Sequence, residues 1–404
     1  MASAGEDNKK RVLILVENLP SPFDRRVWQE ATTLTAAGYL VSIICPTGKG
    51  YEQHYEEIEG IHIYRYDLPM EGEGARGYAV EYGAALWHTF RLAWKVRREH
   101  GFDMVHACNP PDLLFLIGSF FKLFFRTRFL FDHHDINPEL YEAKFGRRDF
   151  FWRLMVWLER ATFWTADVSI ATNESYKRIA IERGKMNPDK VFVVRSGPKL
   201  DRLQIIPPVE SLKKGRKFLV GYVGVMGKQE GIDLLLQAAK SIVCDLGRND
   251  VHFGLVGGGT SLGEMRQFAE ELGIGEYVTF TGRVPDQELL EMLNTADVCV
   301  NPDVANAMND KSTMNKIMEY MALGKPIVQF DLAEGRFSAQ ESSLYATNND
   351  PVDMAQKIVQ LLDDPATCER MGTFGRNRVL NDLEWKYEEP KLLAAYDALF
   401  ANNA

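Results

Sequence analysis

The chain has 404 residues, of which 46% are hydrophobic and 25% are charged, and its formal net charge is −9. This length predicts two or three globular domains, and this composition excludes disordered, collagen-like and simple coiled-coil proteins. The acidic balance excludes a general binder of polyanions, so we expect no nucleic-acid partner.

Cysteines and apolar runs indicate the compartment. The five cysteines lie far apart and form no CxxC pair, which indicates free thiols in a reducing environment rather than disulfides or a zinc site. The first residues, MASAGEDNKKR, lack the features of a secretory signal, and the longest apolar stretch, 113–121, has nine residues. A membrane-spanning helix needs about 20, so we expect a soluble cytoplasmic protein.

In chain order, the first half alternates short apolar runs with longer helical patterns. The runs lack strict alternation, which is typical of parallel strands that are buried on both faces. We expect strands at 11–17, 40–45, 61–66, 104–108, 128–133, 168–172 and 191–195. We expect helices at 25–37, 76–99, 111–124, 139–164 and 174–184. This repetition predicts a doubly wound α/β domain.

A segment rich in proline and basic residues, 197–217, interrupts the alternation and predicts a linker. Strands are then expected at 218–223, 251–256, 278–281, 298–301 and 327–331. Helices are expected at 231–243, 261–272, 286–296, 313–323, 352–363, 366–378 and 387–401. The sequence therefore predicts two Rossmann-like domains in series, whose strands end at a ligand-binding cleft.

The segment 309–326, NDKSTMNKIMEYMALGKP, carries the strongest helix signals. Ser312 or Thr313 is expected to cap a helix that begins near Met314. Gly324 and Pro326 are expected to end it, because glycine ends helices readily and proline cannot continue them.

Charges in this helix indicate a ligand. Lys316 lies in the first turn, where a cation opposes the helix dipole unless an anion is bound at the same end. Glu319 follows one turn after Asn315 on the same face, where its carboxylate could accept hydrogen bonds from two ribose hydroxyls. The alternative is a solvated helix with ordinary charges.

Several motifs along the chain match one family in order and spacing. They are FDHHDINPE at 131–139, LVGGG at 255–259, FTGRVP at 280–285 and Glu319 within MEYMALGKP. With them the chain resembles glycosyltransferase family 4, whose members are retaining enzymes of the two-domain GT-B fold that use nucleotide-sugar donors. The segments NLPSPFDRRVWQEA and WKYEEPKLLAAYDALF suit bacterial members that make surface polysaccharides or exopolysaccharides.

The resemblance covers nearly the whole chain and implies a division of labour. It implies an acceptor-binding domain at 1–200 and a nucleotide-sugar-binding domain at 201–385. It also implies that the helix within 386–404 crosses back to the first domain.

The donor-binding positions depart from the family pattern. The family usually has two glutamates eight positions apart; Glu319 matches the second, but Lys311 holds the first. Val225 and Glu230 hold the positions of the usual phosphate-binding arginine and lysine. Other cations and the amides of the 224–227 turn could bind the phosphates instead. The expected donor-binding residues are Gly224, Gly227, Lys228, Gly257, Arg283, Ser312, Asn315, Lys316 and Glu319.

The strand end FDHHD holds two histidines and two acids, which raises the question of a metal site. Adjacent strand residues point to opposite faces, so His133 and His134 cannot share a metal ion without a bend. The resemblance implies that His134 and Asp135 are catalytic, with His134 donating a hydrogen bond near the donor sugar. The alternative is a histidine whose hydrogen bonds are satisfied by the local backbone.

Asp-x-Asp, the signature of metal-dependent glycosyltransferases, is missing from the sequence. Cations, amides and helix ends would then neutralise the donor phosphates, so we expect no metal or other cofactor. Two strand-end loops are expected to face the acceptor, through Asp24, Arg25, Arg26 and Asn109. For the arginines, an ordinary solvated helix start is the alternative.

Aromatic and basic residues interleave at 87–98 and 120–128. Such segments can rest on an anionic membrane surface, although an ordinary amphipathic helix gives the same pattern. We therefore expect a glycosyltransferase that moves a sugar from a nucleoside-diphosphate sugar to a lipid-linked or growing saccharide, with peripheral membrane contact. The alternatives are an inactive family member acting as a partner subunit, a nucleotide-sugar epimerase of the same fold, and a two-domain solute-binding protein.

Overall fold

A computed structural model describes residues 9–68 and 74–401 of the chain. The chain divides into two compact units, each built around its own sheet. The first unit contains the residues up to Ser196 and those from Glu388 onward, and the second contains Gly197–Tyr387. In the described ranges, no helix has both the length and the apolar character needed to cross a membrane.

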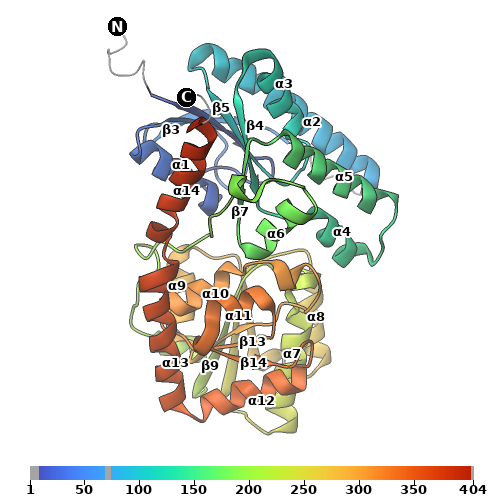
Figure 1. Cartoon of the computed structure of the whole chain (residues 1–404). Coiled ribbons are helices and arrows are strands. Elements are labelled where there is room, and N and C mark those ends of the chain that lie inside the picture. Colours follow the sequence, from blue (N-terminus) through green and yellow to red (C-terminus); the bar gives the residue numbers. More distant parts are fainter. Residues whose placement is uncertain (1–8, 69–73, 402–404) are drawn as a thin grey trace. The chain divides into compact units, whose positions relative to one another are not determined.

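The first unit has an eight-stranded sheet in the order β3-β4-β2-β1-β5-β6-β7-β8 (Figure 1). Its pairs are parallel except at the edge, where β3 runs antiparallel to β4. The strands are β1 Arg11–Leu15, β2 Leu40–Pro46, β3 Tyr55–Ile58, β4 Ile61–Tyr66, β5 Met104–Cys108, β6 Arg128–His133, β7 Val168–Ala171 and β8 Val191–Val193. The helices are α1 Arg25–Ala36, α2 Gly74–Glu99, α3 Phe115–Phe125, α4 Asn137–Phe145, α5 Phe150–Thr165, α6 Glu174–Glu182 and α14 Glu389–Phe400.

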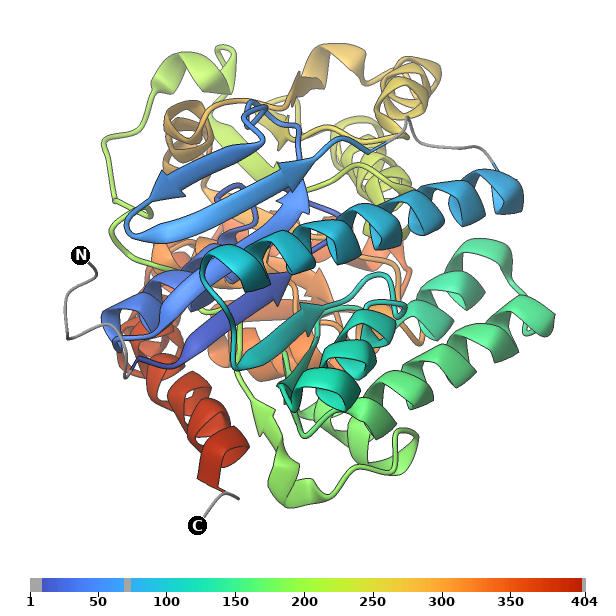
Figure 2. The same ribbon diagram turned by 90° about the horizontal axis from the view of Figure 1, so that it is seen from above.

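Alternation along β6 shows how helices cover both faces of this sheet. Asp132 bonds to Arg26 of α1, whereas the neighbouring Phe131 packs edge-on against Phe163 of α5, with ring centroids 5.0 Å apart. On the first of these faces, Tyr396 of α14 reaches His106 of β5. Helices α2, α3 and α5 run side by side along the other face (Figure 2).

Two predictions for this unit need correction. The helix expected at 139–164 is two helices, because Gly146 ends α4 in a left-handed conformation with φ of 65° and Asp149 caps α5. The edge strand β3 was not predicted, because its sequence, YEEI, is largely polar and lacks the apolar run of the buried strands.

The second unit has a six-stranded parallel sheet in the order β11-β10-β9-β12-β13-β14. The strands are β9 Phe218–Val223, β10 Val251–Val256, β11 Val278–Gly282, β12 Val298–Asn301, β13 Ile327–Phe330 and β14 Ser343–Ala346. The helices are α7 Ile232–Lys240, α8 Leu262–Glu271, α9 Asp286–Thr295, α10 Asn315–Ala322, α11 Ala333–Ala339, α12 Pro351–Leu362 and α13 Pro365–Arg378. Of these elements, β14 and α11 were not predicted.

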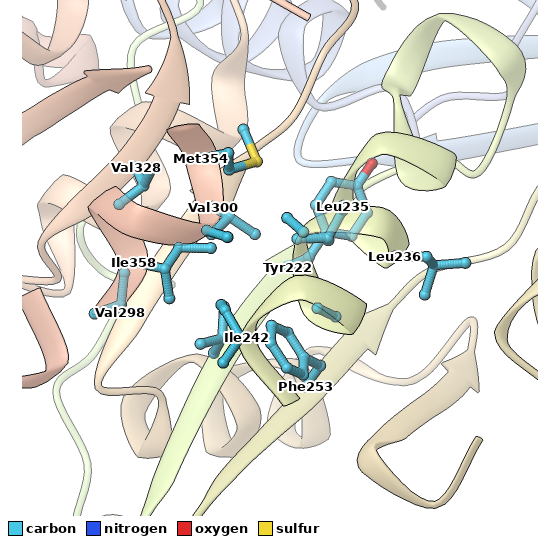
Figure 3. Packing of buried hydrophobic residues seen from close by; sticks show 14 of the residues in the cluster. Tyr222, Leu235, Leu236, Ile242, Phe253, Val298, Val300, Val328, Met354 and Ile358 are labelled. Atoms are coloured by element: carbon cyan, nitrogen blue, oxygen red, sulfur yellow. The ribbon is translucent and has the colours of Figure 1, made fainter. Parts of the chain in front are cut away.

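Each face of the second sheet buries its own apolar cluster. Tyr222 and Phe253 belong to the cluster with Leu235 and Ile358, which come from α7 and α12 (Figure 3). Leu219, three residues before Tyr222 on β9, belongs to the other cluster, which contains residues of α9 and α10. Burial on both faces explains why these strands are nearly continuous apolar runs.

The boundary between the units lies a few residues from the expected one. Residues 197–200 belong to the second unit, because the Trp385 N–H donates to the Pro198 carbonyl at 3.1 Å. Gly197 also packs tightly against this segment, because a Cβ at this position would lie 2.4 Å from the Leu383 carbonyl oxygen. Helix α14 contacts α1, β7 and β8 of the first unit.

Candidate functional site

In the first unit, the loop after β6 is held by the loop after β5. The Asn109 side-chain oxygen accepts the backbone N–H groups of His134 and Asp135 at 2.7 and 3.1 Å. Its amide nitrogen donates to the Asp135 carbonyl at 2.6 Å and to the Asp112 carboxylate at 3.0 Å. Asn109, which was expected to contact the acceptor, is buried in this structure, and both ends of its amide position the His134–Asp135 step.

The His134 ring lies between a buried carboxylate and a buried guanidinium. Its Nε2 is 2.5 Å from Oδ2 of Asp132 and 2.9 Å from Nε of Arg26. Because Nε2 carries at most one proton, the short contact favours the tautomer in which Nε2–H donates to Asp132, and in that tautomer Nε2 cannot accept the Arg26 Nε–H. The other ring nitrogen, Nδ1, is then an acceptor in the neutral ring and becomes a second donor when the ring is protonated.

The two adjacent histidines lie on opposite faces of β6, as strand alternation predicts. The His134 side chain is 14% exposed, whereas that of His133 is fully buried. His133 packs against the rings of Phe163 and Tyr176, with centroids 5.2 and 5.0 Å away. No single metal ion can therefore bridge the pair.

Asp132 is the centre of a buried charge network. Nη2 of Arg26 lies 2.9 Å from Oδ1 of Asp132 and 3.1 Å from Oε1 of Glu30. Burial opposes the ionisation of Asp132, but Arg26 and His134 outweigh it and hold its pKa well below the ordinary value. Burial and the Asp132 charge raise the pKa of Glu30 well above its ordinary value. Arg26 thus faces an ionised Asp132, while the raised pKa of Glu30 favours the protonated form of that carboxyl.

Four side chains of this region have the chemistry of metal ligands. Ligand atoms of Glu30, His106, Cys108 and Asp132 all lie within 4.8 Å of one another. Arg26 already neutralises Asp132, and burial raises the pKa of the Cys108 thiol well above its ordinary value. A metal ion would have to displace that arginine and remove protons from the ligands. We therefore assign these residues to the support of His134.

Most residues expected to meet the acceptor instead build α1. Asp24 caps this helix, because its carboxylate accepts the Val27 N–H at 3.1 Å. Arg26, which was expected to face the acceptor, is instead buried in the charge network and donates to the Val194 carbonyl at 2.9 Å. Arg25 is exposed.

Glu17, just beyond the carboxyl end of β1, was not singled out in the sequence. It is almost fully buried, and burial together with the nearby Glu81 raises its pKa to about 7. A glutamate that directly follows a buried apolar strand is a signal for such a group, because parallel strands end where these sheets bind ligands.

In the second unit, the glycine turns after β9 and β10 pack backbone to backbone. Gly257 has φ of 139°, and a Cβ there would lie 1.8 Å from the Gly224 carbonyl oxygen. Three of the 224–227 amides, which were expected to bind phosphate, donate to groups of the protein itself in this structure. Gly224 donates to the Val256 carbonyl, Met226 to the Gly258 carbonyl, and Gly227 to the Glu230 carboxylate.

The anion expected beside Lys316 is a side chain of the protein itself. The Lys316 Nζ lies 2.8 and 2.9 Å from the two carboxylate oxygens of Asp303 and 5.2 Å from the centre of the Tyr222 ring. Burial alone would lower the pKa of Lys316, but Asp303 outweighs it and raises that pKa. Asp303 was missed in the sequence, although an acid two residues after the β12 strand is a detectable signal.

Helix α10 begins and ends near the expected positions but is capped differently. Its N-cap residue is Met314, with no side-chain cap, and the Ser312 hydroxyl donates to the Met308 carbonyl. The capping prediction is therefore wrong. Gly324 follows the helix with φ of 68°, which confirms it as the stop signal.

Glu319 of α10 is ion-paired in this structure. Its carboxylate bonds to the guanidinium of Arg202, a residue that the sequence did not single out. Arg202 also lies 3.8 Å from Asp286. A ribose at Glu319 would therefore share or displace the Arg202 contact.

The remaining donor-binding candidates lie at the carboxyl edge of the second sheet. Asn315 is the exposed first residue of α10, and Arg283 is exposed directly after β11. Lys228 is exposed and forms no ion pair with any residue that the structure describes. Of the cations considered from the sequence, Lys228 and Arg283 are thus better placed than Lys316 to bind the phosphate of a ligand that arrives from solvent.

Family models match both units. The "Glycosyl transferase 4-like domain" matches residues 24–197, and "Glycosyl transferases group 1" matches residues 217–364. The chain belongs to glycosyltransferase family 4. The two matched regions lie within the two compact units and together make up most of the chain.

Curated relatives of this family-4 chain are named for different substrates. D-inositol 3-phosphate glycosyltransferase of Thermomonospora curvata is 28% identical over 253 residues, which are 57% of each chain. The 2-deoxystreptamine glucosyltransferase of Streptomyces kanamyceticus is 26% identical over 241 residues, covering 57% of this chain and 60% of that protein. The matches thus span about three fifths of the length of these relatives.

Solved structures confirm the GT-B fold. Sucrose-phosphate synthase from Thermosynechococcus elongatus gives a TM-score of 0.81 at 20% identity, over 98% of this chain and 100% of that chain. Anabaena HepE in complex with UDP and glucose gives 0.73 at 15% identity, over 96% and 100%. The prediction of two Rossmann-like domains in the GT-B fold is therefore confirmed.

Proposed function

We propose that this glycosyltransferase moves a sugar from a nucleoside-diphosphate sugar to a lipid-linked or growing saccharide in the synthesis of surface polysaccharide. The observation that carries the proposal is the His134 site. Its ring is fixed by Asp132, which Arg26 holds in turn, and its backbone is fixed by Asn109. A hydrogen-bond donor held rigidly in a partly buried site can stabilise charge that develops in a transition state.

We propose that Glu319 binds the ribose of the donor and that Lys228 and Arg283 neutralise its diphosphate. Glu319 lies one turn into α10, at the carboxyl edge of the parallel sheet where α/β proteins bind nucleotides. The likeness to HepE, which was solved in complex with UDP and glucose, makes UDP-sugars the first donors to test.

We propose that transfer retains the anomeric configuration and needs no metal ion. The bond between the sugar C1 and the departing phosphate oxygen breaks, and the acceptor oxygen bonds to C1 on the same face. The acceptor proton moves to the departing phosphate. In this step the protonated ring of His134 donates a hydrogen bond through Nδ1–H, and it forms no covalent bond to the sugar.

A donor screen followed by product analysis tests this function. Thermal shifts with UDP-, GDP- and dTDP-sugars identify the base, and NMR of the transferred sugar reports the anomeric configuration. We expect stabilisation by one class of donor, retention, and full activity in EDTA. Inversion, or loss of activity in EDTA that a divalent ion restores, would contradict the mechanism.

A second candidate is an inactive family member that acts as a partner subunit. Two carboxylates favour it: Asp303 neutralises Lys316, and Glu230 occupies the Gly227 amide where a phosphate would be expected to bind. Binding of a donor followed by its slow hydrolysis would count against this candidate. Conversion of the donor sugar without any acceptor would instead indicate an epimerase.

We also propose that a lipid-linked acceptor brings the protein into peripheral contact with the inner face of the plasma membrane.

A further inference from the structure

Helix α5 exposes an apolar stripe that its packing on the sheet does not require. Phe150, Leu154, Trp157 and Trp164 are spaced by four, three and seven residues, which places them on one side of a helix. Their exposed fractions are 72, 38, 60 and 87%. The opposite side of α5 already packs on the sheet through Phe163, so this stripe is additional to the apolar face that the core requires.

The neighbouring helix α3 carries a second stripe. Leu116, Leu123 and Phe124 are 45, 75 and 64% exposed. The two helices are joined, because Nζ of Lys122 on α3 donates to the carbonyl of Thr165, the last residue of α5, at 2.7 Å. The stripes therefore belong to adjacent helices on one side of the first unit (Figure 2).

The surroundings of these stripes are basic, although the whole chain has a net charge of −9. In 144–165 the acids are Asp149, which pairs with Arg147, and Glu159, which is buried against Arg183. On α2, a row of exposed cations extends from the exposed Trp87. The exposed basic residues of these segments are Arg91, Lys95, Arg98, Arg126, Lys144, Arg147, Arg148, Arg153 and Arg160.

We propose that helices α3 and α5 dock on an anionic lipid bilayer, with their aromatic side chains at the level of the headgroups. Tryptophan and phenylalanine beside arginine and lysine suit this boundary, where an apolar ring meets lipid tails and a cation meets phosphate. Two copies of this basic surface would repel each other. Anionic lipid instead attracts the cations and accommodates the aromatic side chains, so we favour lipid over a second copy of the chain. No described helix is long and apolar enough to span the bilayer, so this surface lies on it.

The inference deepens the proposed function, because a lipid-linked acceptor would be met at this surface. Its test is independent of transfer, since vesicle binding needs neither donor nor acceptor. The full-length protein is sedimented with vesicles of phosphatidylcholine alone, or of equimolar phosphatidylcholine and phosphatidylglycerol. We expect binding to the anionic vesicles only, and weaker binding as salt rises, because salt screens the charges.

Two variants separate the apolar and the charged contributions. The double variant Trp157→Ser, Trp164→Ser should weaken binding to anionic vesicles by about tenfold or more, since two large apolar groups no longer leave water. The double variant Lys144→Gln, Arg153→Gln should weaken it severalfold, by removing two of the cations that attract anionic lipid. The control Phe337→Ser, Val352→Ser removes two exposed apolar side chains of the second unit and should bind as the wild type.

Circular dichroism and donor hydrolysis verify that each variant is folded. The proposal would be overturned if the wild type did not bind anionic vesicles. It would also be overturned if the tryptophan variant bound them as tightly as the wild type does. Concentration-dependent dimers without lipid that disappear in the tryptophan variant would assign the surface to a second copy and also overturn it. Loss of transfer with normal vesicle binding would contradict the proposed function and leave the docking surface standing.

Discussion

The two units share an architecture but place charge and apolar surface differently. In the first, ionic groups are buried beneath His134, while aromatic side chains such as Trp157 and Trp164 lie in solvent. In the second, ion pairs such as Lys316–Asp303 lie at the ligand edge, and Phe337 is the one strongly exposed aromatic among its described residues. A parallel sheet needs only inward-facing stripes on its helices, so the fold itself does not require these differences.

The first prediction tests whether the buried network of the first unit serves catalysis. His134→Ala should lower turnover by about 10²-fold or more, the range expected when one preorganised donor is lost. Nucleotide affinity should change little, because the nucleotide is expected to bind the second unit. Steady-state kinetics and calorimetry measure the two effects.

The adjacent histidine supplies the control for that variant. His133→Ala should lower the melting temperature, because His133 is fully buried against aromatic rings, but the fraction that stays folded should turn over. A dead His133 variant beside a fully active His134 variant would reverse our assignment of the two faces of β6.

The second prediction concerns the ligand edge of the second unit. Glu319→Gln should weaken nucleotide binding tenfold or more, since charge-assisted hydrogen bonds contribute roughly 1.5–3 kcal/mol each. Arg202→Ala removes the ion pair but keeps the carboxylate, so its nucleotide affinity should not fall. Unchanged affinity of the Glu319 variant in calorimetry would remove Glu319 from the ribose site.

The third prediction separates the two lysines. Lys228→Ala should weaken binding of the nucleoside diphosphate about fivefold and leave the bare nucleoside unaffected, as expected for an exposed cation near phosphate. Lys316→Ala should chiefly lower stability, because it leaves the buried Asp303 carboxylate unpaired. Equal losses for the diphosphate and the nucleoside in the Lys228 variant would show that this lysine does not contact phosphate.

The smallest effects concern pH, and they have opposite signs in the two units. The pKa of Glu17 is raised to about 7, so the folded state holds this proton more tightly. Its contribution to stability is present below its ordinary pKa of 4.5 and is lost as pH rises through about 7. Urea unfolding at pH 5 and pH 8 measures this loss. Between these pH values, we expect the free energy of unfolding to fall less in Glu17→Gln than in the wild type, by on the order of 1 kcal/mol.

His252 on β10 gives the opposite dependence in the second unit. Burial, together with Arg216 and Lys214, lowers its pKa to about 4. The stability it contributes is present above its ordinary pKa of 6.5 and is lost as pH falls through about 4. His252→Gln should weaken the dependence of the free energy of unfolding on pH below 6.5 and leave it unchanged above. A change at alkaline pH instead would refute the assignment.

The sequence predicted most strands because burial on both faces leaves continuous apolar runs, as in β9 and β10. It missed β3, whose edge position tolerates polar residues, and it joined α4 to α5 because Gly146 and Asp149 were not read as a stop and a cap. Helical periodicity alone does not show where one helix ends and the next begins.

Site residues were harder to predict than the fold, because a charged residue near a strand end can face either ligand or core. Arg26 and Asn109 were expected at the acceptor, but tertiary contacts bury them as supports of His134. Their partner Asp132 lies inside an apolar strand, two residues before His134 on the same face. Alternation could have identified Asp132, whereas the pairing of Arg202 with Glu319 joins positions too distant in sequence for any local pattern.

The position of α14 in the sequence determines which unit is the last to receive all its residues during synthesis. Tyr396 of this helix bonds to His106 within the first sheet, yet the ribosome synthesises it after all of residues 197–387. Domains usually fold from the amino terminus during synthesis. Here the whole chain of the second unit is made before the last helix of the first, so the unit that is begun first is the last to receive all its residues.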